Sequence, residues 1–212
     1  MSSPESTRAG VRIHPSADVA ADVAIGAGTR IWHEVQVREK VVIGSECILG
    51  KGVYIDFGVH IGDRCKLQNG VSVFHGFNLE DGVFLGPGVM LLNDKNPRAI
   101  NRDGTLKSGE DWKVSEAIVK RGAAVGGGAV VLPGVDIGRF ALVGAGSVVT
   151  KAVPDQAIVY GNPARLAGFA CECGHQLLVV ERVGEHMRMR CGECGTESSI
   201  PLLAYEQIRG VI

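Results

Sequence analysis

The chain has 212 residues, of which 30 are glycine, and only 5% are aromatic. This length suits one domain of ordinary size with a small appendage, and so few aromatic residues argue against a core built on large rings. The 22 lysines and arginines nearly balance the 23 aspartates and glutamates, so net charge predicts neither nucleic acid nor a membrane as a partner. Residues 1–10 lack the apolar stretch of a signal peptide, and no apolar run approaches the ~18 residues of a membrane span. We expect residues 1–10 to form a flexible arm and the protein to be cytoplasmic.

A six-residue repeat dominates the sequence. From Ile13 to Leu91 every sixth residue is Ile, Leu or Val, and the spacing resumes from Val119 to Val149. The residue two positions before each of these is small or β-branched in nearly every case, and glycine often follows. A period of six fits neither an α-helix nor a simple alternating strand. It predicts an all-β triangular coil with one short strand per side, two inward side chains per strand and glycine-rich corners. Coils of 18 residues would stack as parallel strands about 4.8 Å apart, about six and a half coils in all.

Two polar residues that the repeat places outward share a corner of successive coils. His75 lies two residues after Val73, and Asn93 lies two residues after Leu91, one full coil further on. We therefore expect them to stack about 4.8 Å apart. A histidine with a pKa near ~6.5 can accept a proton at neutral pH. His75 is interpreted as a catalytic base, as a hydrogen-bond partner of the substrate, or as a structural residue.

A second outward column holds His33, Lys51 and Asn69, which again follow one another at intervals of one coil. Two interpretations of this column stay open: its residues are exposed to solvent or packed at an interface, or they contact a substrate.

Residues 92–116 interrupt the repeat with a polar, charged segment, and the corner that holds His75 and Asn93 lies where this segment begins. Long loops inside a compact solenoid are usually functional or disordered, and Trp112 favours docking over disorder. Two interpretations stay open: a tolerated surface insertion, or a loop that covers the substrate and reaches a neighbouring subunit.

The composition changes after residue 168, so the expected organisation is an arm (1–10), a β-helix domain (11–168) and a small tail (169–212). The tail contains Cys171, Cys173, Cys191 and Cys194, in a CxC and a CxxC that are each followed by glycine. This spacing predicts a ribbon-like structural Zn²⁺ site, because four thiolates leave no open position for catalysis. Free thiols and a redox role are the alternatives. Cys47 and Cys65 lie in the inward register and are interpreted as small core residues.

The hexapeptide repeat resembles the left-handed parallel β-helix of the hexapeptide-repeat acyltransferases, from Ile13 to about Gly168. The resemblance implies a homotrimer with active sites between neighbouring subunits. The segment YGNPAR (160–165) is similar to one that borders coenzyme A in that family. The stretch NGVSVFHGFNLEDGVFLGPGVMLLNDKNPRA (69–99) resembles nucleotide-sugar 3-N-acetyltransferases, especially those acting on UDP-2-acetamido-3-amino-2,3-dideoxy-glucuronate.

This resemblance implies acetyl-CoA as the donor, a nucleotide-linked amino sugar as the acceptor, and direct attack of the amine on the thioester. Asn93 would be the active-site asparagine, and His75 stands where the relatives usually carry an acidic residue. The expected substrate-binding residues are Asn69, Lys95, Pro97 and Arg98. The expected cofactor-binding residues are Gly126, Gly144, Ala145, Lys151, Pro163 and Arg165. A dTDP-3-amino-deoxyhexose or another amino sugar as acceptor, and a non-catalytic trimeric β-helix scaffold, are the alternatives.

Overall fold

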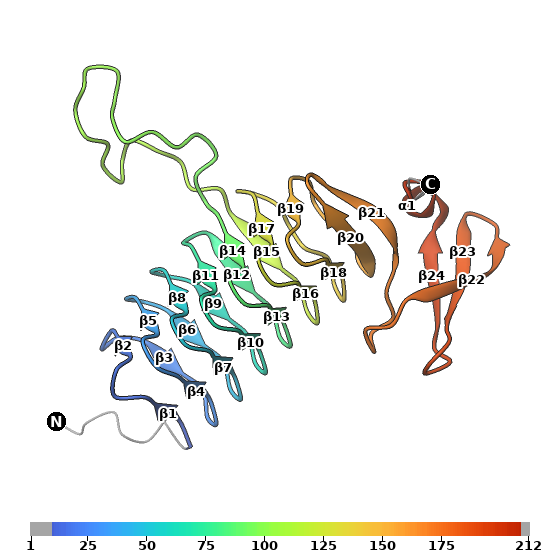
Figure 1. Ribbon diagram of the computed structural model, residues 1–212, viewed down its shortest axis with the longest axis horizontal. Coiled ribbons are helices and arrows are strands. Elements are labelled where there is room, and N and C mark those ends of the chain that lie inside the picture. Colours follow the sequence, from blue (N-terminus) through green and yellow to red (C-terminus); the bar gives the residue numbers. More distant parts are fainter. Residues whose placement is uncertain (1–9, 209–212) are drawn as a thin grey trace.

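A computed structural model describes residues 10–208; the expected arm lies outside the described residues except for Gly10. The chain winds into a three-sided prism of stacked coils, with a small sheet packed at its C-terminal end (Figure 1). The strands are short because each side of a coil holds only two or three residues before the next corner. None of the helices in residues 10–208 is long and apolar enough to cross a membrane.

Three sheets form the sides of the prism. The first sheet contains β1 (Arg12–Ile13), β4 (Arg30–Ile31), β7 (Ile48–Leu49), β10 (Lys66–Leu67), β13 (Phe84–Leu85), β16 (Ala124–Val125), β18 (Leu142–Val143), β20 (Ala157–Gly161) and β21 (Ala164–Phe169). The second contains β2 (Asp18–Val19), β5 (Gln36–Val37), β8 (Tyr54–Ile55), β11 (Ser72–Val73), β14 (Met90–Leu91), β17 (Val130–Val131) and β19 (Val148–Val149). The third contains β3 (Ala24–Ile25), β6 (Val42–Ile43), β9 (His60–Ile61), β12 (Phe77–Leu79) and β15 (Ala117–Val119). All pairs within these sheets are parallel except β20 with β21.

The core is the inward-facing pair of columns that the repeat predicts. Val35, Val37, Cys47 and Leu49 are at most 2% exposed, and the same two positions stay buried along the prism. At the N-terminal end the predicted core residues, such as Ile13, are only half-buried because no earlier coil covers them. Burial of two aliphatic side chains per strand supplies the hydrophobic stabilisation of the coils.

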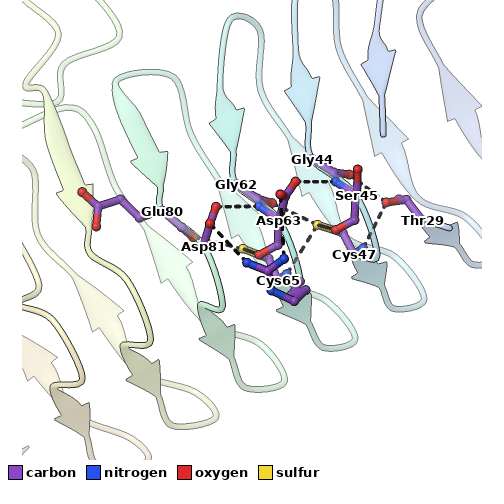
Figure 2. Close-up of polar contacts among 10 residues, drawn as sticks. Thr29, Gly44, Ser45, Cys47, Gly62, Asp63, Cys65, Glu80 and Asp81 are labelled. Carbon is purple, nitrogen blue, oxygen red and sulfur yellow. Dashed lines mark hydrogen bonds and ion pairs between the residues drawn. The ribbon is translucent and has the colours of Figure 1, made fainter. Parts of the chain in front are cut away.

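We call the turns from the first to the second sheet the first corner, those from the second to the third sheet the second corner, and those from the third to the first sheet the third corner. At the third corner, carboxylates hold successive coils together (Figure 2). Asp81 Oδ1 accepts a hydrogen bond from the backbone N–H of Asp63 at 2.9 Å, and Asp63 Oδ1 accepts one from Ser45 at 2.7 Å. Beside them, the buried thiols of Cys47 and Cys65 donate to the carbonyls of Gly62 and Glu80. These thiols are core residues, as predicted.

The predicted number of coils is too low. Among the described residues the first sheet has eight parallel strands, because the repeat continues past Val149 with Val153 and Val159. Val119 pairs with Ile137, one regular coil further along the chain, but the next coil, from Ile137 to its partner Val153, is shorter by two residues. This shortening near Ala152 therefore hid the last coil from a strict six-residue count.

Residues 92–116 leave the prism as a long loop between β14 and β15 (Figure 1). From here on, the arm means this loop of residues 92–116 and not residues 1–10. The tail forms an antiparallel sheet of β22 (Leu177–Val183), β23 (His186–Cys191) and β24 (Glu197–Pro201), followed by α1 (Leu202–Tyr205). Gln156 Nε2 of the last coil donates to Ala170 O at 3.2 Å and to Ser198 Oγ at 3.1 Å, which ties the tail to the prism.

Candidate active site

His75 and Asn93 lie in adjacent coils at the second corner, as their spacing of one coil predicts. They follow β11 and β14, which pair in parallel, and Asn93 Nδ2 donates a hydrogen bond to His75 O at 2.9 Å. The arm starts and returns here, because Ser115 N donates to Asn93 O and Ala117 N donates to Gly76 O. The hydrogen bond to His75 O fixes the amide group of Asn93 through its nitrogen. Within residues 10–208 its Oδ1 has no hydrogen-bond partner, so it can accept a hydrogen bond from a ligand.

The imidazole of His75 is held in one orientation by the coil below. Its ring stacks on the Phe57 ring with centroids 3.9 Å apart, and Nδ1 lies 2.9 Å from Phe57 O. A carbonyl oxygen only accepts hydrogen bonds, so Nδ1 carries the proton. In the neutral ring Nε2 then holds a free lone pair, which is the state that a general base requires.

The buried carboxylate of Asp56 holds the backbone at the second corner in place. Asp56 is 7% exposed. Its Oδ1 accepts hydrogen bonds from Arg38 Nη1 at 3.1 Å, the Tyr54 hydroxyl at 3.0 Å and Phe57 N at 2.9 Å, while Oδ2 accepts one from His75 N at 3.2 Å. Burial raises the pKa of the Tyr54 hydroxyl, which keeps it protonated as a donor. Asp56 therefore fixes the backbone of both Phe57 and His75.

This network was not predicted from the sequence, although the sequence contains a signal for it. Arg38 and Asp56 occupy the same repeat position in successive coils, directly after an inward aliphatic residue. Opposite charges on neighbouring strands at that register predict an ion pair, in which Asp56 lies one coil below His75 and Arg38 two coils below it.

A row of three pockets runs along the second corner from the arm to the tail. The pocket around Leu92 and Asp94, on either side of Asn93, has a volume of about 470 Å³ and also includes Lys95, Pro97 and Lys151. It shares Lys151 with a pocket of about 430 Å³ that includes Arg165. It shares Asp94 with a pocket in the arm of about 410 Å³, lined by Arg98 and Trp112 among others. The structure thus brings five of the predicted ligand-binding residues to one row.

The remaining predicted residues lie elsewhere. Asn69 is at the first corner, where it lines a pocket of about 220 Å³ with Trp32, His33 and Lys51, and its Oδ1 accepts a hydrogen bond from Lys51 N at 3.0 Å. This hydrogen bond from a backbone N–H to a side-chain oxygen of the next coil is like those of Asp63 and Asp81 at the third corner, so Asn69 has a structural role.

The predicted cofactor-binding residues Gly126, Gly144 and Ala145 also lie at the first corner, in the turns after β16 and β18. A Cβ on Gly126 would lie 2.5 Å from Ala145 N, so close stacking of two turns already requires glycine there. Pro163 is exposed in the turn between β20 and β21. Within one chain, the predicted cofactor-binding residues are therefore divided between two separate regions.

The four tail cysteines form a second cluster of chemically capable side chains. Cys171, Cys173, Cys191 and Cys194 place their Sγ atoms within 4.8 Å of one another. They lie beyond the last coil, away from His75 and Asn93 in the fold.

Coils of three hexapeptides, with two inward aliphatic positions on each side, define a hexapeptide-repeat β-helix. Residues 40–75 and 118–151 match the family model described as the hexapeptide repeat of succinyl-transferase. The chain therefore has the hexapeptide-repeat fold, the left-handed parallel β-helix that such repeats build.

Comparison with curated proteins finds acetyltransferases. The chain is 50% identical over 64 residues to a dTDP-3-amino-3,6-dideoxy-α-D-galactopyranose 3-N-acetyltransferase from Aneurinibacillus thermoaerophilus, covering 30% of this chain and 33% of that protein. It is 35% identical over 85 residues to the serine acetyltransferase of Escherichia coli (strain K12), covering 40% of this chain and 30% of that protein. The chain thus spans about a third of the length of these curated relatives.

Among solved structures, the chain is similar to PerB from Caulobacter crescentus, whose structure is a complex with CoA and GDP-perosamine. The TM-score is 0.41 at 27% identity, covering 76% of this chain and 58% of that chain. A second similar structure is the product of the BC4754 gene from Bacillus cereus, with a TM-score of 0.49 at 23% identity, covering 74% of this chain and 80% of that chain.

Proposed function

We propose that the protein is a cytoplasmic N-acetyltransferase that moves an acetyl group from acetyl-CoA to the 3-amino group of a nucleotide-linked amino sugar. The observation that carries the proposal is the second corner, where His75 Nε2 and Asn93 Oδ1 are available as acceptors in adjacent coils, and where Leu92 and Asp94, on either side of Asn93, line a pocket. The curated relative from A. thermoaerophilus supports the same reaction class, because it is a nucleotide-sugar 3-N-acetyltransferase.

The reaction needs few groups. The amine nitrogen attacks the thioester carbonyl, a C–N bond forms, and the C–S bond breaks to release coenzyme A as its thiol. His75 Nε2 accepts the proton that the amine loses and passes it to the leaving thiolate. Asn93 Oδ1 accepts a second amine N–H and orients the nucleophile. If the leaving thiolate takes the proton directly from the amine, His75 serves to bind the sugar, and its loss then raises KM rather than lowering kcat.

The most specific part of the proposal is the identity of the acceptor sugar. The segment 69–99 favours UDP-2-acetamido-3-amino-2,3-dideoxy-glucuronate by resemblance, and the curated relative favours a dTDP-3-amino-deoxyhexose. Arg98 is exposed in the arm, and its planar fork suits either a sugar carboxylate or a diphosphate. Lys95 and Lys151 supply further positive charge to the same row of pockets.

A homotrimer would unite the divided cofactor-binding residues. One subunit would contribute Lys151 and Arg165 from its row of pockets, and its neighbour the first-corner turns at Gly126 and Ala145. The arm supports assembly, because Ile100 and Leu106 are 55% and 78% exposed in the single chain although both are large and apolar. Burial of these side chains against a second copy would stabilise the trimer.

The test is thiol release from acetyl-CoA, with mass spectrometry of the product, for UDP-2-acetamido-3-amino-2,3-dideoxy-glucuronate beside dTDP-3-amino-hexoses. Turnover with an acetyl mass added to the UDP acid supports the full proposal. Turnover only with a dTDP sugar keeps the reaction and changes the acceptor. No turnover with any of these amines contradicts the proposed acetyl transfer to them and favours the alternative, a non-catalytic trimeric scaffold.

A further inference from the structure

The four tail thiols have the spacing of a metal site. All four cysteines are free, and the Sγ atoms of Cys171 and Cys194 lie 3.5 Å apart, those of Cys173 and Cys191 3.6 Å apart. Four sulfurs at the Zn–S distance of ~2.3 Å in a tetrahedron lie about 3.8 Å from one another. The observed distances are close to that figure and far above the ~2.05 Å of a disulfide bond.

Two matching backbone loops hold these thiols. In the first loop Cys171 N donates to His175 O at 2.7 Å, and Gly174 N donates to Cys171 O at 2.8 Å. In the second, Cys191 N donates to Thr196 O at 2.9 Å, and Gly195 N donates to Cys191 O at 3.1 Å. The sulfur atoms converge because each pair of cysteines is presented by its own closed loop, which is a prepared metal site rather than a chance cluster.

The tail that carries this cluster also forms a wall of the pocket at the end of the prism. The pocket of about 430 Å³ is lined by Lys151 and Arg165 on the β-helix side and by Glu206 and Gln207, directly after α1, on the tail side. The helix α1 packs on β24 and β23, and β23 ends at Cys191. The metal ligand and the pocket wall are therefore linked through one small sheet.

We propose that Zn²⁺ bound by the four tail cysteines holds Glu206 and Gln207 against the prism, and that the pocket so completed takes the adenine-nucleotide end of coenzyme A. This assignment of the ligand rests on the proposed use of acetyl-CoA. Lys151 and Arg165 pair with phosphate, Val153 and Leu166 provide apolar surface for the base, and the side-chain oxygens of Glu206 and Gln207 accept from its amino group. The tail has few buried side chains of its own, so the metal supplies the rigidity that the wall needs.

The first experiment measures metal in the purified full-length protein. About one zinc per chain is expected, together with the absorption of a tetrathiolate site when cobalt replaces zinc. Cys194→Ser should lose most of the metal, and Cys65→Ser, a matched control in the prism core, should keep it. Protein without metal that takes up neither zinc nor cobalt would overturn the proposal.

The second experiment measures the Kd of coenzyme A by calorimetry for native protein, chelator-treated protein and protein reloaded with zinc. Metal removal should weaken binding about tenfold, and zinc should restore it; about 1.4 kcal/mol corresponds to that factor. Equal affinity with and without metal overturns the link between tail and pocket. If the metal-loaded protein fails to bind coenzyme A, the proposed function fails, while the metal analysis still decides the zinc site.

Discussion

Removing the Asp56 carboxylate tests whether the site rests on a buried polar network. In Asp56→Ala, the N–H groups of Phe57 and His75 and the Tyr54 hydroxyl each lose a hydrogen-bond acceptor. At about 1 kcal/mol for each bond, the loss is roughly 3 kcal/mol. The Arg38 side chain is 39% exposed and keeps Glu39 as a partner, so its contribution adds at most about 1 kcal/mol.

The matched control is Asp63→Ala, which removes one hydrogen bond to a backbone N–H at the third corner and is expected to cost about 1 kcal/mol. Both variants are unfolded in urea at equal protein concentration, and the free energies of unfolding are compared. Because Asp56 also positions His75, its variant should lose kcat more than the control does. Equal destabilisation of the two variants would refute the argument that Asp56 organises this corner.

Two further substitutions test the arm. Gly76 has φ of +98°, and a Cβ there would lie 2.6 Å from Val114 Cγ1 and 3.0 Å from Ser115 O, so Gly76→Ala should cost about 1–3 kcal/mol more than Gly134→Ala, where the nearest atom is 3.6 Å away. Equal thermal unfolding midpoints for the two variants would contradict this difference. Leu106→Asp should weaken trimer assembly roughly 10- to 100-fold, as measured by sedimentation, because burial of a leucine contributes about 1.5–3 kcal/mol; unchanged assembly would show that the arm does not dock on a neighbour.

The prism was largely predictable because its core depends on one local rule. Two inward positions per six residues fix the strands, the corners and the register together, so the stacking of His75 on Phe57 and of Asn93 on His75 follows from counting one coil along the chain. The interruption after Leu91 is equally visible, because a polar segment cannot supply the inward aliphatic residues.

Other features depend on side-chain geometry that the six-residue repeat does not specify. The orientation of the His75 ring is set by a carbonyl oxygen, and the Asp56 network combines three residues of one coil with Arg38 below and His75 above. The two-residue shortening near Ala152 preserves the inward pattern while changing its spacing, so a fixed count lost the last coil. The contact of Glu206 with the pocket of Lys151 depends on how the tail packs, which no repeat encodes.

The most direct test of the account is the steady-state kinetics of His75→Ala and Asn93→Ala with an accepted amino sugar at saturating acetyl-CoA. If these side chains handle the amine, kcat should fall about 10²-fold or more for His75→Ala, with the unfolding midpoint little changed, and Asn93→Ala should lower kcat/KM. Wild-type kcat and wild-type kcat/KM in both correctly folded variants would contradict the placement of acetyl transfer at the second corner.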